Sequence, residues 1–132
     1  MAFIINDSIR ILDIQELFTE MFPFLKIEFY RKGVHAGNGT IDIKQPNISK
    51  DKTLAEVSTI SKNSHLTVSP EMTVSELESF IMDNYGITVQ VFRKSGNVWI
   101  KTSLTDSWAL EDQNHQGELI TQQMNDRKSK AS

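Results

Sequence analysis

Apolar side chains recur at helical spacing in two stretches of the chain, and each stretch leads into a segment where apolar and polar residues alternate. Residues 13–22 and 73–85 have the helical spacing, with one apolar stripe each. Residues 25–30 and 87–92 alternate as half-buried strands do. Both alternating segments end in a basic pair and a glycine, in the strings FYRKG and FRKSG. The pattern therefore predicts a helix followed by a strand, twice.

The second helix has complete start and stop signals. Thr73 and Glu76 form a capping box, in which each side chain bonds the other residue's unpaired backbone N–H. Gly86 follows the apolar stripe and suits the residue after a helix end. In the first helix the matching signals are Asp13 as the cap and Pro23 as the stop.

The elements around these helices also occur twice in the same order. Short strands precede each helix, and a further strand and a short helix follow each glycine turn. The chain thus predicts an α+β fold of two βαββα repeats, with the helices packed on a mixed or antiparallel sheet. The alternative is an ordinary α+β domain whose halves share only their turn and cap signals. The predicted flanking elements are strands at 2–6, 66–69, 40–44 and 98–101, and helix starts at 51 and 106.

These repeats predict one domain rather than two. A chain of 132 residues fits a single core. We expect the domain to span residues 1–117, with repeat one at about 2–58 and repeat two at about 64–115. Gly117 is expected to break the last helix, and the polar stretch 118–132 is expected to be a flexible tail.

A resemblance to a known group of proteins rests on the second repeat. The stretch that carries it reads MTVSELESFIMDNYGITVQVF, with KTLAEV before it and SWALED after it. It resembles small uncharacterised bacterial proteins that repeat the pattern M-x-V-x-x-L followed by F/Y-G, a strand and a T-L-A helix. The resemblance covers about residues 10–112 and departs from the pattern at 33–52, where the connection is longer. It implies a tandem fold and no assigned activity, and it supplies no catalytic positions.

Composition narrows the class of protein without naming a function. The net charge is −3, from 14 basic and 17 acidic residues, so there is no global attraction to nucleic acid or to anionic lipid. The chain has no cysteine, which excludes disulfides and thiolate sites. Its first residues are neither a secretory signal nor a membrane span. We therefore expect a cytoplasmic protein that does not bind membranes.

The second basic string offers a candidate binding surface. A two-residue turn at Ser95-Gly96 would pair Phe92 with Trp99 on the sheet face turned away from the helices. Tyr30 holds the equivalent place in the first repeat and could extend this face. The pair either stabilises the hairpin or forms a contact surface, since exposed aromatic and arginine side chains are typical interface anchors. The same register pairs Val91 with Ile100 on the core face and Gln90 with Lys101 on the outer face.

The last predicted helix adds one more aromatic residue. It is expected to begin at Asp106 as the cap. Trp108 would then close the second repeat as a core residue, or else join Trp99 as an exposed anchor. The residues singled out for partner binding are Phe92, Trp99, Tyr30, Arg93, Lys94 and Trp108.

The chemistry of catalysis and metal binding has no support in this sequence. The histidines at 35, 65 and 115 share no ligand spacing. The glycines of 33–40 precede a strand rather than a helix, so they predict a hairpin connection and not a phosphate loop. We expect no enzyme activity, no cofactor and no metal.

Two functions remain open, and an enzyme with an unusual site between the repeats would be a third if a deep pocket placed His35 or His65 beside a carboxylate. The first is a non-catalytic interaction module that binds a protein partner, or another copy of itself, through the aromatic hairpin face. The alternative is a single-stranded nucleic-acid-binding protein that uses the basic hairpin tips, although the acidic charge balance argues against it. The basic residues of those tips are Arg31, Lys32, Arg93 and Lys94.

Overall fold

The computed structural model describes residues 2–31, 35–36, 40–41, 48–60 and 63–131 of the chain. They form an α+β fold, as the sequence predicts. Of the predicted strand at 40–44 and the connection at 33–40, only the β3–β4 ladder lies within the described residues. The elements are β1 (Phe3–Asn6), α1 (Ile11–Met21), β2 (Leu25–Arg31), β3 (His35–Ala36), β4 (Thr40–Ile41), α2 (Leu54–Val57), β5 (His65–Val68), α3 (Val74–Tyr85), β6 (Ile87–Ser95), β7 (Val98–Lys101), η1 (Ser103–Thr105) and α4 (Leu110–Ala131).

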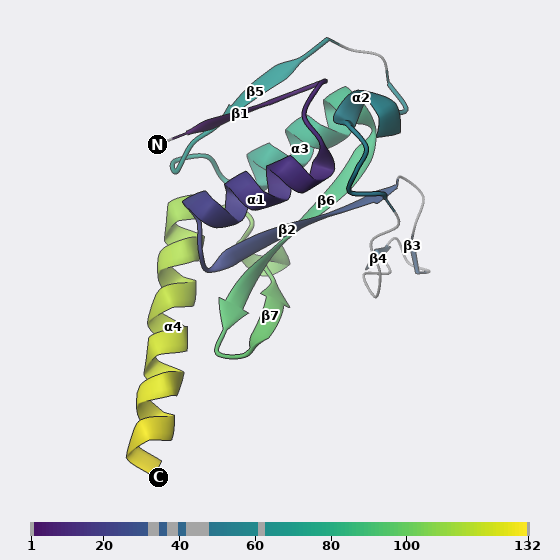
Figure 1. Ribbon diagram of the computed structural model, residues 1–132. Coiled ribbons are helices and arrows are strands. Elements are labelled where there is room, and N and C mark those ends of the chain that lie inside the picture. Colours follow the sequence, from purple (N-terminus) through teal and green to yellow (C-terminus); the bar gives the residue numbers. More distant parts are fainter. Residues whose placement is uncertain (1, 32–34, 37–39, 42–47, 61–62, 132) are drawn as a thin grey trace.

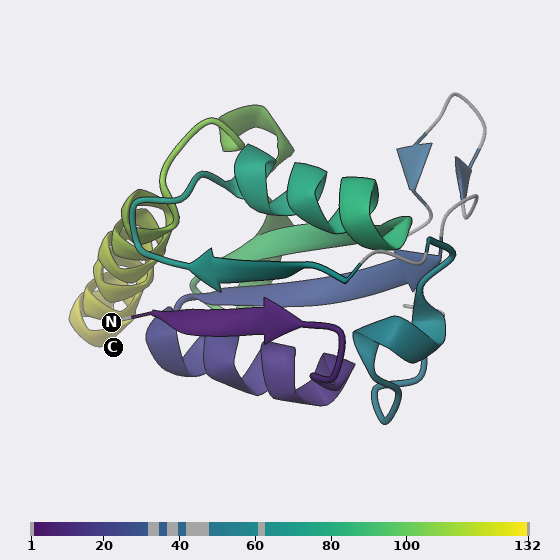
Figure 2. The ribbon, with the colours of Figure 1, turned by 90° about the horizontal axis from the view of Figure 1, so that it is seen from above.

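The body of the molecule has three layers (Figures 1 and 2). An antiparallel sheet in the order β2-β6-β7 forms one layer. Helix α1 packs on β2 and α3 packs on β6, and the antiparallel ribbon β1–β5 covers the two helices on their other side. Helix α4 packs against β6, and both α4 and the β6–β7 hairpin project from the body in the same direction (Figure 1).

The core lies between these layers because each element turns its apolar side chains inward. Along β2, the alternating residues Leu25, Ile27 and Phe29 are buried, as period-two patterning requires. The helices and the ribbon bury residues at helical or alternating spacing against them. These residues include Ile11, Ile14, Phe18, Val74, Leu77, Ile81, Ile5 and Val68.

The start and end of α3 are as the sequence predicts. The Glu76 N–H donates to Thr73 Oγ1 at 3.0 Å, and the Thr73 N–H donates to Glu76 Oε1 at 3.1 Å. Gly86 ends the helix in the left-handed region at φ 69°. Both signals are local, and each works through neighbours in sequence.

The predicted cap of the first helix is wrong. Helix α1 begins at Ile11, after Arg10, and no side chain caps it. The Ile11 N–H instead donates to the backbone oxygen of Lys52 at 2.9 Å. The Asp13 carboxylate pairs with the Arg10 guanidinium at 2.9 Å. A backbone hydrogen bond from a distant segment thus caps the start of α1, where the sequence predicted a side-chain cap.

The predicted start of the last helix is also wrong. Asp106 follows the 3₁₀ turn η1, and its backbone oxygen accepts from the Ser75 N–H at 2.8 Å. Helix α4 begins later, at Leu110, whose N–H donates to the Met72 oxygen at 2.7 Å. The first N–H groups of each of these helices therefore bond carbonyl groups in the segment that leads into the other helix.

The predicted break at Gly117 does not occur, and α4 continues to Ala131 through the stretch expected to be a flexible tail. Gly117 is buried, and a Cβ there would lie 3.0 Å from Phe24 Cβ and 3.1 Å from Arg93 Cγ. The missing side chain lets α4 lie close to β6. This glycine serves packing rather than helix termination.

The two halves of the chain make corresponding backbone bonds at their helix starts. Helix α1 exchanges N–H to carbonyl bonds with the segment leading into α2, and α3 does so with the segment leading into α4. A duplicated unit would produce this correspondence, but the βαββα repeat itself stays a prediction. The corresponding donor–acceptor pairs are Ile11–Lys52 with Val74–Trp108, Leu12–Lys50 with Ser75–Asp106, Leu54–Ile9 with Leu110–Met72, and Ala55–Asp7 with Glu111–Pro70.

Candidate functional site

The β6–β7 hairpin turns one residue later than the sequence predicted. Ser95 pairs with Val98, so Gly96 and Asn97 form the turn, and Gly96 has a φ of 66°. Phe92 pairs with Lys101 and not with Trp99. The predicted register is therefore wrong by two residues. An even shift keeps every side chain on its face, so the faces are as predicted.

The outer face of the hairpin holds a small aromatic and basic cluster. Lys26 Nζ lies 5.2 Å from the ring centre of Phe92 and 5.1 Å from that of Trp99. Phe92 is 7% exposed beneath this lysine, whereas Trp99 is 37% exposed. Tyr30 is buried and does not extend the exposed surface. Of these aromatic rings, Trp99 is the one that a partner can reach.

Arg93 and Trp108 lie on the opposite face, toward α4. The Arg93 guanidinium lies 5.7 Å from the Trp108 ring centre, and its Nη1 donates to Gln113 Oε1 at 2.8 Å. Its Nε is buried and has no hydrogen-bond partner among the described residues, and burial lowers the pKa of this guanidinium. Trp108 is 40% exposed, so the expectation of a core residue is wrong. Arg93 ties the hairpin to α4 and is not available as a free basic tip.

Strand β7 is exposed along its whole length, on both faces. Val98 and Ile100 are exposed apolar residues on the face that carries Arg93, while Trp99 is exposed on the other face. The predicted pairing of Val91 with Ile100 is part of the wrong register, and Ile100 does not reach the core. An edge strand with exposed apolar residues is a template for pairing with another chain.

The backbone of β7 presents its outward groups in a fixed register. The Thr102 N–H donates to Val91 O at 3.2 Å, so Thr102 and, in alternation, Ile100 turn their backbone groups toward β6. Trp99 and Lys101 therefore turn their N–H and C=O groups away from the sheet. These are the groups that an added strand would bond.

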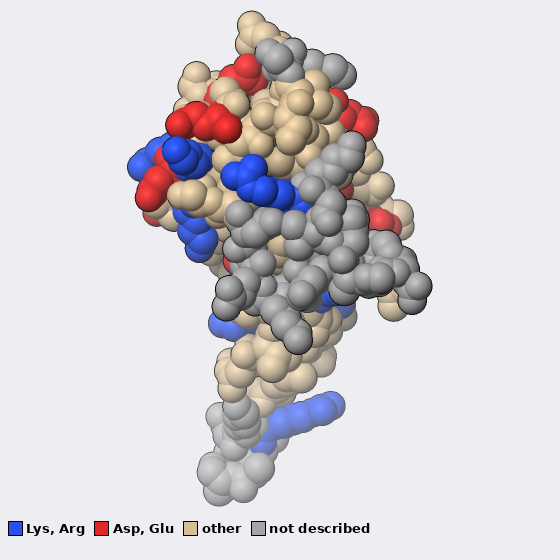
Figure 3. Space-filling view, turned by 90° about the vertical axis from the view of Figure 1, so that its right-hand side faces the viewer, with Lys and Arg blue, Asp and Glu red and all other residues tan. Residues whose placement is uncertain are grey.

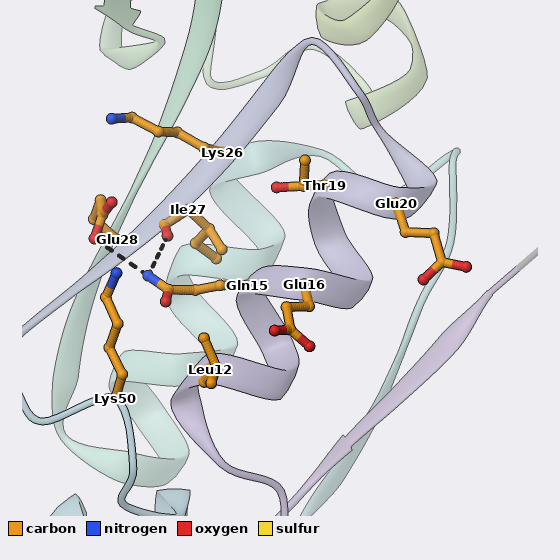
Figure 4. Close-up of a pocket in the computed structure, with 9 residues that line it drawn as sticks. All are labelled: Leu12, Gln15, Glu16, Thr19, Glu20, Lys26, Ile27, Glu28 and Lys50. Carbon is orange, nitrogen blue, oxygen red and sulfur yellow. Dashed lines mark hydrogen bonds between the residues drawn. The ribbon is translucent and has the colours of Figure 1, made fainter.

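The other edge of the sheet, along β2, is partly covered by α1 (Figure 4). Gln15 of α1 reaches this edge, and its Nε2 donates to Ile27 O at 2.9 Å and to Glu28 Oε2 at 3.2 Å. The groove between α1 and β2 has a volume of about 490 Å³ and is lined by charged side chains that include Glu16 and Lys50. Charged side chains and a covering helix are ordinary ways to block an edge. Of the two edges, β7 is the open one.

The charge near the open edge is positive. Lys26, Lys94 and Lys101 share the face of Trp99, because they occupy pairing positions of the same parity. The lower part of the surface in Figure 3, where the hairpin and α4 project, is mostly uncharged, and the charged side chains visible there are basic. The sequence pattern named Lys94 as a binding residue and placed Lys101 on the outer face, but it did not indicate Lys26, which the pairing of β2 with β6 brings to this face.

A second feature that the sequence reasoning missed is a hollow beside α3. It has a volume of about 340 Å³, and its lining includes Glu78, Asp83 and Asp106. Burial, followed by the negative charge of Asp106, raises the pKa of the Glu78 carboxyl to about 7. No local signal could have found this site, since Asp106 arrives from the turn after β7.

Neither a metal site nor a membrane span is found in the part of the chain that the structure describes. No group of three His, Asp or Glu side chains there could hold a metal ion. His65 and His115 are exposed and far apart in the sequence. No helix among the described residues combines the length and the apolar composition needed to cross a bilayer.

The comparisons with known proteins do not assign a family. No protein-family model matches the chain, and no curated protein or solved structure is significantly similar to it.

Proposed function

We propose that the chain is a non-catalytic interaction module that accepts an extended segment of a protein partner along the open edge of β7. The observation that supports it most is that β7 is exposed on both faces, while Gln15 of α1 already bonds a backbone oxygen of the opposite edge, that of Ile27. Addition of a strand to a free edge is a common mode of peptide recognition. The proposal includes a reducing, cytoplasmic setting, in keeping with a chain that lacks cysteine.

Site-specific photo-crosslinking in the cells of origin tests this function. A photo-reactive phenylalanine analogue at Val98 should yield discrete protein adducts, because Val98 is 58% exposed on the proposed edge. The same analogue at Ile4, which is 54% exposed on β1, is the matched control and should yield none of these adducts. Equal adduct patterns from both positions, or none from Val98, would contradict the proposal.

A proline substitution distinguishes backbone pairing with a partner strand from non-specific hydrophobic association. Lys101→Pro removes an outward N–H and leaves the bonds between β7 and β6 in place. We expect it to abolish the Val98 adducts, whereas Lys101→Gln, which keeps the N–H, should retain most of them. Circular dichroism verifies that both variants are folded. Adducts that survive Lys101→Pro in a folded protein would exclude strand addition.

A second candidate function is binding of single-stranded nucleic acid. The cluster of Lys26, Phe92 and Trp99 favours it, because stacking rings beside basic residues are what such proteins use. Binding of this kind would weaken steeply with salt and would not depend on the outward N–H of Lys101. Titration of Trp99 fluorescence with oligonucleotides at two salt concentrations distinguishes it from strand addition.

A further inference from the structure

We infer that the segment accepted by β7 is an antiparallel strand in which acidic residues alternate with apolar ones. This inference rests on the proposed function and adds the chemical class of the partner. It follows from the different character of the two faces of β7. One face carries lysines beside Trp99, and the other carries exposed Val98 and Ile100.

The register of an added strand follows from the outward groups of Trp99 and Lys101. In an antiparallel pair, residues that exchange both hydrogen bonds lie directly opposite each other and share a face. The partner residues that bond Trp99 and Lys101 therefore project onto the lysine face. A carboxylate opposite Lys101 would lie beside its ammonium group. A carboxylate opposite Trp99 would lie on the far side of that residue from Lys94, which pairs with Trp99 on β6.

The intervening partner residues would project onto the other face of the hairpin. There they would lie opposite Ile100 and Val98, which are 37% and 58% exposed. Apolar side chains at these positions would remove that apolar surface from water. The pattern that fits both faces is thus acidic and apolar residues in strict alternation.

A second copy of this chain fits the edge less well. Two β7 strands paired about a two-fold axis would place the lysines of both copies on one continuous face. Neither β7 supplies an acidic residue to neutralise them, since its sequence is VWIK. Like charges on neighbouring strands are unfavourable. Charge complementarity therefore favours an acidic strand from another protein.

Synthetic peptides of about eight residues, the length of an ordinary strand, test the inference. The probe alternates glutamate and valine and is N-methylated at its valines, so that it can pair only through its glutamate edge. Two probes paired through that edge would place glutamates opposite each other, which is unfavourable. Fluorescence anisotropy should show that it binds the full chain. The same peptide N-methylated at its glutamates should bind about tenfold or more weakly, because its methyl groups face Trp99 and Lys101.

Charge reversal provides the decisive comparison. The folded Lys94→Glu/Lys101→Glu variant should bind the glutamate–valine peptide about tenfold or more weakly than the wild type does. It should instead bind an otherwise identical lysine–valine peptide. A wild-type preference for a threonine–valine peptide would overturn the acidic assignment and leave the open-edge function standing. Failure of every one-edge peptide, together with no Val98 adducts, would overturn both.

Two other occupants have distinct outcomes in the same assays. A dimer in light scattering that Lys101→Pro abolishes would mean that a second copy fills the edge, and the inference would be wrong. It would also be wrong if a single-stranded oligonucleotide displaced the peptide and bound equally to wild type and Lys101→Pro. The inference of an acidic protein strand is supported if the chain is a monomer and an oligonucleotide does not displace the bound peptide.

Discussion

At the scale of single residues, the Glu78 carboxyl has a pKa far from its ordinary value. It lies in the hollow beside α3, where burial and the charge of Asp106 raise its pKa to about 7. A carboxyl with a raised pKa binds its proton more tightly in the folded chain than in the unfolded chain. Its favourable contribution is therefore present at low pH and is lost as the pH rises from about 4.5 to about 7.

This linkage predicts the effect of Glu78→Gln on stability. The substitution should raise the free energy of unfolding by about 1 kcal/mol at pH 8, a value reduced for the partial exposure of the site, and change it little at pH 4. Chemical denaturation at both pH values measures it. Glu71→Gln, at an exposed position, is the control for loss of one charge. A Glu78→Gln effect that is the same at both pH values would refute the raised pKa.

Local residue signals predicted some features of the structure and missed others for a physical reason. Thr73, Glu76 and Gly86 act on backbone groups within a few positions, so sequence alone placed α3 correctly. The start of α1 depends on a backbone hydrogen bond from the Ile11 N–H to the Lys52 oxygen, and the residues near Ile11 do not predict this bond. Contacts between residues far apart in the sequence cannot be predicted from local patterns, because only the fold brings the two residues together.

At the scale of elements, α4 shows how tertiary packing overrides propensity. A glycine inside a helix costs about 1 kcal/mol relative to alanine, and this cost motivated the predicted break at Gly117. Close packing against Phe24 and Arg93 compensates for it, because a Cβ at residue 117 would lie only 3.0 Å and 3.1 Å from them. Helix α4 begins at Leu110 and not at the predicted Asp106 for a similar reason, since the Met72 oxygen accepts from the Leu110 N–H.

The packing role of Gly117 predicts the result of enlarging it. Gly117→Leu should destabilise the chain by about 1–3 kcal/mol, because the side chain has no space between α4 and β6. Gln122→Leu introduces the same side chain at an exposed position of α4 and should be nearly neutral. Thermal unfolding of both variants makes the comparison. Equal stability of the two would mean that α4 does not pack closely on β6.

The hairpin shows which part of a binding surface the sequence can predict. The alternation of residues predicted the two faces correctly, and they survived the error in register. The turn was misplaced because two adjacent dipeptides, Ser95-Gly96 and Gly96-Asn97, both carry a hairpin signal. The exposure of Phe92 and Trp99 could not be predicted, since both rings contact Lys26, which comes from a strand far away in the sequence.

At the scale of the whole molecule, the arrangement of layers separates the two edges of the sheet. The body covers β2 through α1, whereas β7 extends beyond it beside α4 (Figure 1). Within this sheet, the exposed edge of β7 is the better place for an added strand. The proposed function and the proposed acidic, apolar partner both depend on that openness.

Residue-resolved hydrogen exchange of the free chain tests this openness most directly. The amides of Trp99 and Lys101 should exchange rapidly, while those of Ile100 and Thr102, which face β6, should be protected. Addition of the glutamate–valine peptide should then protect Trp99 and Lys101. If all four amides are equally protected in the free chain, β7 is not an open edge and the account is wrong.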